Sequence, residues 1–539
     1  MTLLHLATEE GAVKIIRFLL NSLKSHEKIL KSLLEATTDY YKETALHLAA
    51  AGGYLNVVQC LVEHGANVNV KSNNSKTVLH SAARGNLDVV QWWVEHRADV
   101  NVKSDDGKTV LHSAARGNLD VIQWLVEHGA DVNIKNDDGE TVLHSAAQWN
   151  TWDVVQWLVE HGADVNAKSD DGETVLHSAA KWNTWDVVQW LVEHGAGVNV
   201  KSDDGETVLH SAAQWGNLDI VQWLVEHGAD VNVKSIYGQT VLHSAAWGNL
   251  DVVQWLVKHG SDVNVKSIYG QTVLHSAAWG NLDVIQWLVE HGADFNVKSD
   301  DGETVLHSAA QCGNFDVIQW LVEHGADVNV KSDDGETVLH SAAQWGNLDV
   351  VQWLVEHGAD VNGKSNDGET VLHSAARANL DVVQWLVEHG ADVNIKSNNG
   401  ETVLHSAAKW NIWDVVQWLV EHGADVNIKS NNGETVLHSA AKDNLDVVQW
   451  LVEHGADVNI KNDDGETVLH SAAQWDKWDV IQWLVEHGAD VNAKSDDGQT
   501  VLHSAAQRDK WDVVQWLVEH GADVNATDID SKTLLNLAE

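Results

Sequence analysis

The 539-residue chain contains no proline and only two cysteines, Cys60 and Cys312, which lie far apart in the sequence. Without proline, no Pro-rich linker marks a boundary between domains. Two widely separated cysteines cannot build a disulfide framework, and they are compatible with a reducing compartment. We therefore expect a single domain and a cytoplasmic location.

Basic residues and long apolar runs are also scarce. The chain has 34 Lys and Arg against 79 Asp and Glu, a formal net charge of -45. Such a charge repels nucleic-acid phosphate and anionic lipid and favours partner proteins with basic surfaces. No stretch approaches the roughly 18 apolar residues of a membrane-spanning helix, and the N-terminus lacks the pattern of a signal peptide. We expect no nucleic-acid binding, no membrane insertion and a monomer.

A repeated tetrapeptide dominates the chain. Thr-Val-Leu-His occurs fourteen times between residues 77 and 503, and successive copies begin 32 or 33 residues apart. One such unit cannot bury its apolar face alone, so the copies are predicted to stack into one continuous solenoid. Function is then expected on the surface of that solenoid.

Residues 136–168 illustrate one unit. Asp137-Asp138-Gly139 predicts a tight hairpin turn, after which Thr141 caps a short helix with Leu143 and two alanines on one face. Trp149-Asn150-Thr151 ends that helix. A second helix then runs from about Asp153 to Gly162, which closes it in the left-handed conformation.

The string from Asp-Gly-Glu-Thr-Val-Leu-His-Ser-Ala-Ala to Leu-Val-Glu-His-Gly-Ala-Asp-Val-Asn closely resembles the ankyrin repeat. The resemblance covers essentially the whole chain and implies an all-α, elongated and curved ankyrin-repeat solenoid of about sixteen units, each a β-hairpin or turn followed by two antiparallel helices. It also implies that hairpin tips and inner helices form a concave face that binds proteins, and it makes Asn133 and Asn166 candidate acceptors for asparaginyl hydroxylation. We predict a divergent first repeat with an insertion at 1–43, tandem repeats over 44–526, and an incomplete repeat at 527–539.

The chain departs from the family pattern in three ways. Valine replaces the usual proline at positions such as Val142 and Val175, so the first helices should start less sharply. Six intervals have 32 residues, and there the first helix should be shorter; they begin at His80, His112, His243, His275, His373 and His438. The insertion around residues 25–34 predicts a lengthened second helix or an extra helical hairpin.

The 32 histidines do not predict a metal site or a catalytic centre. All but His26 occupy two positions that recur in each unit. Equivalent residues in adjacent layers lie about 9 to 10 Å apart, too far for two nitrogens to share one zinc ion. We interpret the Leu-His rings as structural, hydrogen-bonded within their own or the adjoining turn. His144 and Ser145 do not face each other as a base and a nucleophile would, and the Asp-Asp-Gly-Glu tips lack a calcium-loop pattern. No catalytic residue, metal or cofactor is predicted.

The 28 tryptophans fall into three series. Those in Gln-Trp-Leu-Val, such as Trp157, and those in Trp-Asp-Val, namely Trp152, Trp185, Trp413, Trp478 and Trp511, are interpreted as core residues. The third series follows the Ala-Ala pair, where ankyrin repeats vary and face ligands. It consists of Trp149, Trp182, Trp215, Trp247, Trp279, Trp345, Trp410 and Trp475. Local packing and ligand anchoring are equally compatible with this third series, whose rings should be exposed and too far apart to stack.

Two consecutive hairpin tips lose their acidic pair. Ile236-Tyr237 and Ile268-Tyr269 replace Asp-Asp, close to Trp247 and Trp279. Exposed aromatic side chains are enriched at binding hot spots, so we expect the principal contact patch there. The sequence therefore favours a non-catalytic protein-binding scaffold. The alternative is a structural or spring-like segment of a larger protein such as a toxin, channel or bacterial effector.

Overall fold

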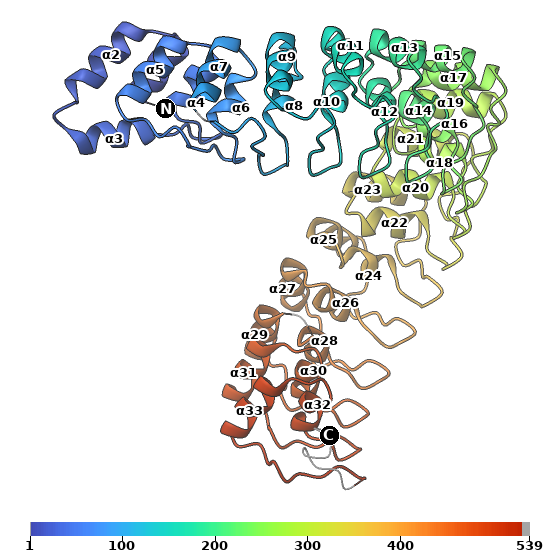
Figure 1. Ribbon diagram of the computed structural model, residues 1–539. Helices are drawn as coiled ribbons and strands as arrows, with labels where there is room; N and C mark the ends of the chain where they lie inside the picture. The colour runs from blue at the N-terminus through green and yellow to red at the C-terminus, as the bar shows by residue number, and fades with distance from the viewer. Residues whose placement is uncertain (1, 97, 443, 531–539) are drawn as a thin grey trace. The chain divides into compact units, whose positions relative to one another are not determined.

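The computed structural model describes residues 2–96, 98–442 and 444–530 and consists of two compact units, residues 1–268 and 269–539. Within each unit, pairs of short antiparallel helices follow one another along the chain, and a hairpin loop projects from the same side of every pair (Figure 1). None of the described helices combines the length and apolarity that crossing a bilayer requires. The described chain is all-α apart from isolated β-bridges in the hairpins.

Among its described residues, the first unit contains eight helix pairs and one additional helix, α3 (Glu27–Glu35). Its first helices are α1 (Leu3–Glu9), α4 (Ala45–Ala51), α6 (Val78–Ala82), α8 (Val110–Ala114), α10 (Val142–Gln148), α12 (Val175–Lys181), α14 (Val208–Gln214) and α16 (Val241–Ala245). Its second helices are α2 (Val13–Ser22), α5 (Leu55–Glu63), α7 (Leu87–Glu95), α9 (Leu119–Glu127), α11 (Trp152–Glu160), α13 (Trp185–Glu193), α15 (Leu218–Glu226) and α17 (Leu250–Lys258).

The second unit contains eight further pairs among its described residues. Its first helices are α18 (Val273–Ala277), α20 (Val305–Cys312), α22 (Val338–Gln344), α24 (Val371–Ala375), α26 (Val403–Lys409), α28 (Val436–Ala440), α30 (Val468–Gln474) and α32 (Val501–Ala506). Its second helices are α19 (Leu282–Glu290), α21 (Phe315–Glu323), α23 (Leu348–Glu356), α25 (Leu380–Glu388), α27 (Trp413–Glu421), α29 (Leu445–Glu453), α31 (Trp478–Glu486) and α33 (Trp511–Glu519).

A threonine and a histidine together start each repeated first helix. In α10, Thr141 has extended backbone angles and its N–H donates to Nδ1 of His144 over 3.1 Å, while its Oγ1 lies 2.9 Å from the same nitrogen. The ring thus satisfies one of the backbone donors that a helix start leaves without a partner. The expectation that valine would blunt the helix start was wrong, because every first helix from α6 onward begins at the valine that follows the threonine.

The same ring joins one repeat to the next. Since Nδ1 of His144 accepts a hydrogen bond, the proton is on Nε2, which lies 3.4 Å from the carbonyl oxygen of Glu173 in the following repeat. His177 makes the equivalent contact to Glu206. Burial lowers the pKa of His144 to about 4, although the bond to the Glu173 carbonyl acts in the opposite direction. The prediction that these histidines are structural is confirmed.

The core consists of one narrow set of apolar residues per repeat. Leu143, Ala146 and Ala147 of α10 and Val155 and Leu158 of α11 have no exposed surface. First helices pack against each other from repeat to repeat, as α10 does against α12, because alanines allow a close approach. The predicted apolar faces of both helices are confirmed.

The hairpin tips hydrogen-bond to one another. A β-bridge pairs Lys168 with Thr174, and the N–H of Asp203 donates to the carbonyl oxygen of Asp171 in the preceding tip over 2.9 Å. Gly172 has a φ of +75°, and a Cβ there would lie 2.7 Å from the Asp203 backbone nitrogen. The turn therefore needs glycine both for its backbone angle and for its close approach to the next tip.

Differences in repeat length are absorbed by the first helix. The six repeats of 32 residues have first helices of five residues, namely α6, α8, α16, α18, α24 and α28, whereas α10 has seven. This confirms the predicted shortening. The insertion near the N-terminus forms the separate helix α3 rather than a longer α2. Most of the incomplete repeat predicted at 527–539 lies outside the described residues.

We predict that acid destabilises the chain through the Leu-His rings. The rings of His144, His177 and His210 have a folded-state pKa of about 4, below the ordinary value of 6.5, so the stability they confer is fully present above pH 6.5 and is lost as pH falls toward 4. Each of these three rings contributes on the order of 3 kcal/mol. Urea unfolding followed by far-UV circular dichroism should show that the urea concentration at half-unfolding is lower at about pH 5 than at about pH 7. Burial raises the pKa of Glu173 and acts in the opposite direction, so a constant or rising midpoint would contradict the role given to histidine.

We also predict that Gly172→Ala is more destabilising than Gly162→Ala. Both glycines have positive φ, +75° and +92°, but an added Cβ meets the next hairpin only at Gly172 and has no neighbour within 4 Å at Gly162. The control, Gly162→Ala, should lower the free energy of unfolding by about 1 kcal/mol because of backbone strain. Gly172→Ala should lower it by about 1 to 3 kcal/mol more. Urea unfolding measures both, and equal losses would show that the tip contact is unimportant.

Candidate protein-binding surface

Eight tryptophans are exposed at the C-terminal ends of first helices or in the loop that follows. They are between 44% and 59% exposed: Trp149, Trp182, Trp215, Trp247, Trp279, Trp345, Trp410 and Trp475. Trp149, for example, is the C-cap residue of α10 and precedes Asn150, which has a positive φ of 54°. The helix ends there, so the indole has no further turn of its own helix to pack against. The predicted exposure of this series is confirmed.

Some of these rings contact each other or a cation. Trp182 and Trp215 stack with centroids 6.3 Å apart and an angle of 20° between their planes. The expectation that such rings could not stack was wrong for this pair, because the long indole side chains lean across the spacing between layers. The guanidinium of Arg116 lies 4.3 Å from the centre of the Trp149 ring, and Nζ of Lys181 lies 5.6 Å from that of Trp215. Both cations are within range of an attraction to the ring face.

The side chains of the apolar hairpin tips are exposed, and their backbone has the same geometry as that of the other tips. In the first unit, Ile236 and Ile268 are 56% and 57% exposed and Tyr237 is 40% exposed. The Ile236 N–H still donates to the Asp204 carbonyl oxygen, and the Ile268 N–H to that of Tyr237. The tip-to-tip bonds are therefore independent of the side chains. Tyr269 and Trp279, also exposed, belong to the second unit.

The prediction that the tryptophans in the middle of the second helices are core residues was wrong, with two exceptions. Trp157 is half-buried and stacks on His161, one turn later, with centroids 3.9 Å apart. Nδ1 of that histidine lies 2.8 Å from the Trp157 carbonyl oxygen. Val155 and Leu158 fill the space between layers, so the indole is left at the edge, where the ring of His161 covers one face. Trp93 and Trp190 are buried.

The tryptophans that begin second helices are likewise not in the core. Trp152 and Trp511 are exposed, and Trp185, Trp413 and Trp478 are half-buried. Four of the five meet a tryptophan of the next second helix edge to face, with centroids 5.8 to 6.2 Å apart: Trp152 with Trp190, Trp185 with Trp223, Trp413 with Trp450, and Trp478 with Trp516. These contacts connect neighbouring second helices at the surface rather than inside.

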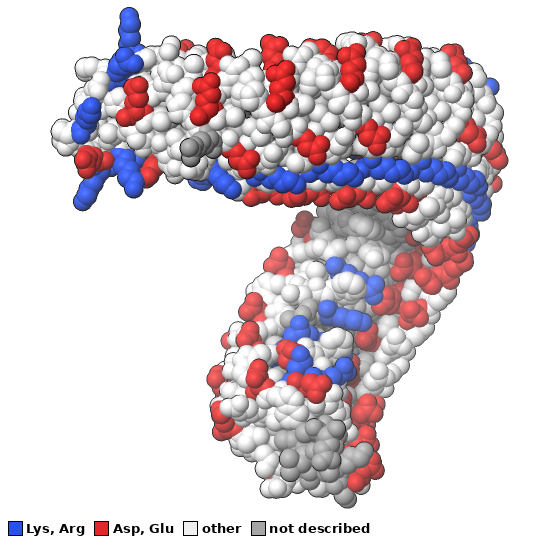
Figure 2. All heavy atoms as spheres, viewed as in Figure 1, with Lys and Arg blue, Asp and Glu red and all other residues white. Residues whose placement is uncertain are grey.

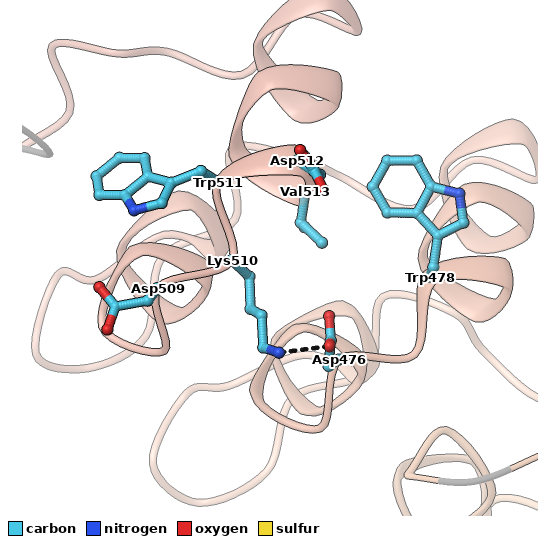
Figure 3. Close-up of a pocket in the computed structure, with 7 residues that line it drawn as sticks. All are labelled: Asp476, Trp478, Asp509, Lys510, Trp511, Asp512 and Val513. Atoms are coloured by element: carbon cyan, nitrogen blue, oxygen red, sulfur yellow. Dashed lines mark ion pairs between the residues drawn. The ribbon is translucent and has the colours of Figure 1, made fainter.

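A pocket of about 770 Å³ opens beside the last described helices (Figure 3). The indoles of Trp478 and Trp511 lie on opposite sides of it, and Lys510 points to Asp476, with Nζ 2.5 Å from the carboxylate. Asp509, Asp512 and Val513 complete the lining. Sequence reasoning missed this pocket, although Asp-Lys in the loops before Trp478 and Trp511 replaces the Gly-Asn found before many second helices.

Charge is arranged in rows along the first unit. Lys135 donates from Nζ to the carbonyl oxygen of Lys168, and Lys168 to that of Lys201, each over 2.8 Å. Figure 2 shows a row of basic side chains running along this unit next to a parallel row of acidic ones. The lysines are therefore engaged between repeats, whereas the acidic tips face solvent. Asp170 and Asp171 are both exposed.

The histidine and asparagine side chains are occupied by structural bonds. His144 is 2% exposed and both ring nitrogens are engaged, so it is not placed to act on a substrate with Ser145. Asn133 donates to the Gly162 carbonyl oxygen and accepts from the Asp164 N–H of the next repeat, and Asn166 makes the same pair of bonds. Over the described ranges, the structure has no cluster of three or more His, Cys, Asp or Glu suited to a metal ion.

Comparison with known families agrees with this architecture. The family described as ankyrin repeats (3 copies) matches residues 22–104, 79–169, 166–235, 233–299, 295–365, 362–430, 414–495 and 437–528. The chain belongs to the ankyrin-repeat family. It is also similar to the NF-kappa-B inhibitor alpha of Homo sapiens, with 43% identity over 70 residues, and to that of Sus scrofa, with 41% identity over 70 residues. These matches cover 13% of this ankyrin-repeat chain and 21% of each relative.

We predict different costs for removing exposed and buried tryptophans. Replacing both Trp182 and Trp215 by alanine should cost about 0.5 to 1.5 kcal/mol, the value of their stacking, because both rings remain half in solvent. Trp190→Ala should cost about 3 to 5 kcal/mol, because that ring is only 7% exposed. Urea unfolding of the variants provides the measurement. A larger loss in the double variant would mean that these rings serve local packing.

Proposed function

We propose that this ankyrin-repeat chain is a non-catalytic scaffold that binds other proteins through its hairpin tips and the exposed ends of its first helices. The eight exposed tryptophans carry the proposal, because their positions recur while the neighbouring Ala-Ala pair is fully buried. Large rigid side chains left in solvent contribute contact area at a low cost in conformational entropy. The relatives are named as inhibitors of NF-kappa-B, which supports a protein as the kind of partner.

The principal contact patch of the first unit is proposed to consist of Ile236, Tyr237, Trp247 and Ile268. All four are exposed by 40% or more, in a row of tips that is otherwise mainly acidic or amide. Their backbone hydrogen bonds are those of the other tips, so stability does not explain the exchange of charge for apolar surface. In the second unit, Tyr269 and Trp279 are proposed as contact residues of that unit.

The acidic tips are proposed to favour partners with basic surfaces. Exposed carboxylates such as Asp171 and Asp204 carry the charge of the row, and the net charge of the chain is -45. Such complementarity speeds association and weakens as salt rises. Cys60 and Cys312 are free, and burial raises the pKa of the Cys312 thiol, so both fit the reducing cytoplasm where we propose that the chain acts.

We predict that Ile236→Asp with Tyr237→Asp abolishes most partner capture without unfolding the chain. The double variant restores the Asp-Asp tip of neighbouring repeats, so far-UV circular dichroism should stay the same while recovery of crosslinked partners falls about tenfold or more. Quantitative mass spectrometry after affinity capture measures the recovery, and crosslinks identify the contacted repeats.

The matched control is Asn73→Asp with Asn74→Asp. It adds the same charge to a hairpin tip of the same unit that carries no apolar side chain at these two positions. Its capture should equal that of the wild type. Equal capture by the Ile236 and Tyr237 variant would exclude the patch, and equal losses in both variants would assign the effect to charge alone.

A further inference from the structure

Two positions at the ends of the first helix lie close together in several repeats. One is the residue before the capping threonine and the other is eight residues later. Carboxylate oxygens of Glu369 and Glu434 are 2.5 Å and 3.1 Å from the cationic groups of Arg377 and Lys442. In two further repeats the partner is an amide: Glu303 accepts from Gln311 over 2.8 Å and Glu466 from Gln474 over 2.9 Å. An acidic residue at the first position therefore meets a donor at the second.

Two consecutive repeats of the first unit carry cations at both positions. Lys76 and Arg84 occupy these positions at the ends of α6, and Lys108 and Arg116 occupy them at the ends of α8. Asp106 is the acidic neighbour, with its carboxylate 3.5 Å from Nζ of Lys108. Lys76, Arg84 and Arg116 form no ion pair with any residue that the structure describes. Four cations are thus gathered in a chain that is otherwise strongly acidic.

The electrostatics of this cluster are unfavourable without a ligand. Burial lowers the pKa of Lys76, and Arg84 adds to the effect, as do Arg116 and Lys108, while Asp106 opposes it. Burial and the charge of Arg84 likewise lower the pKa of Arg116. An anion bound among these groups would relieve their repulsion and accept their hydrogen bonds.

The cluster has an aromatic boundary and a limited length. The guanidinium of Arg116 lies over the ring of Trp149, which is exposed at the start of the next repeat's loop. Beyond it, the position of Lys76 and Lys108 is taken by Glu140, Glu173 and Glu206. Burial raises the pKa of Glu173 and Glu206, and neighbouring carboxylates add to the rise. An anionic ligand that continued along this face would therefore meet carboxylates.

We propose that Lys76, Arg84, Lys108 and Arg116 form a binding site for a short peptide segment rich in Asp and Glu. Two layers span about 20 Å, which corresponds to about six residues of extended peptide. A nucleic acid carries charge continuously along its backbone and would run into the acidic positions from Glu140 onward, so a short peptide fits better. The site goes beyond the proposed function, since its partner is acidic rather than basic.

The test compares wild-type protein with the variant Lys76→Glu, Lys108→Glu. These changes introduce the residue found at the same position in most other repeats, where Glu369 pairs with Arg377, so the helical circular dichroism and the urea midpoint should not fall. Fluorescence anisotropy should show that a fluorescein-labelled oligoglutamate of about six residues binds the wild type. The Kd of the variant should be raised about tenfold or more, which is a loss of about 1.4 kcal/mol or more.

Three comparisons make the result specific. Lys258→Glu, which makes one such charge reversal at an exposed position of α17, should leave the Kd unchanged. The variant Ile236→Asp, Tyr237→Asp should also bind oligoglutamate like the wild type, so failure of the apolar patch and failure of this site can be told apart. Added NaCl should weaken binding.

Three outcomes would overturn the proposal. They are no binding of oligoglutamate to the wild type, equal binding to the charge-reversed variant, and tighter binding of a single-stranded oligonucleotide of similar length. If a phosphoserine peptide binds and oligoglutamate does not, the site recognises phosphate rather than carboxylate, and the assignment to Asp and Glu is wrong.

Discussion

One hydrogen-bonded relay holds the repeats together. The ring of His144 accepts from the N–H of Thr141 at the start of its own helix and donates toward the Glu173 carbonyl oxygen of the next repeat. Helix initiation and stacking thereby depend on the same side chain in the same tautomer. Buried polar groups are costly without partners, so a protonated ring could not replace the neutral one. The small apolar core can be narrow because this polar contact recurs at nearly every junction.

The repeat pattern predicted most of this architecture. The five-residue helix α6 followed from a missing residue after the Ala-Ala pair, and the buried Leu143 and Val155 followed from helical spacing. The errors concern which side chains of a second helix face the interior. The sequence predicts Trp157 in the core, but Val155 and Leu158 fill the interior and His161 covers the indole.

Surface features could be predicted where a position recurs in each repeat, as for the exposed tryptophans, or where the sequence changes abruptly. Ile236 and Tyr237 interrupt an acidic series, and that change of composition is visible without a structure. The cations at Lys76 and Arg84 also depart from the prevailing residues, but nothing in a linear sequence says that positions eight residues apart face each other. The contact of Glu369 with Arg377 established that geometry. The pocket beside Trp511 likewise depends on the loop conformation that brings Lys510 to Asp476.

The links between repeats end mainly on main-chain oxygens. Lys135 bonds to the Lys168 carbonyl, Asn133 to the Gly162 carbonyl and His144 to the Glu173 carbonyl. Every amino acid has a main-chain carbonyl oxygen, so these hydrogen bonds form whichever residue the next repeat carries at that position. Whole units can accordingly be gained, lost or reordered by recombination while each new boundary retains its bonding, and residues at the surface are free to diversify from copy to copy.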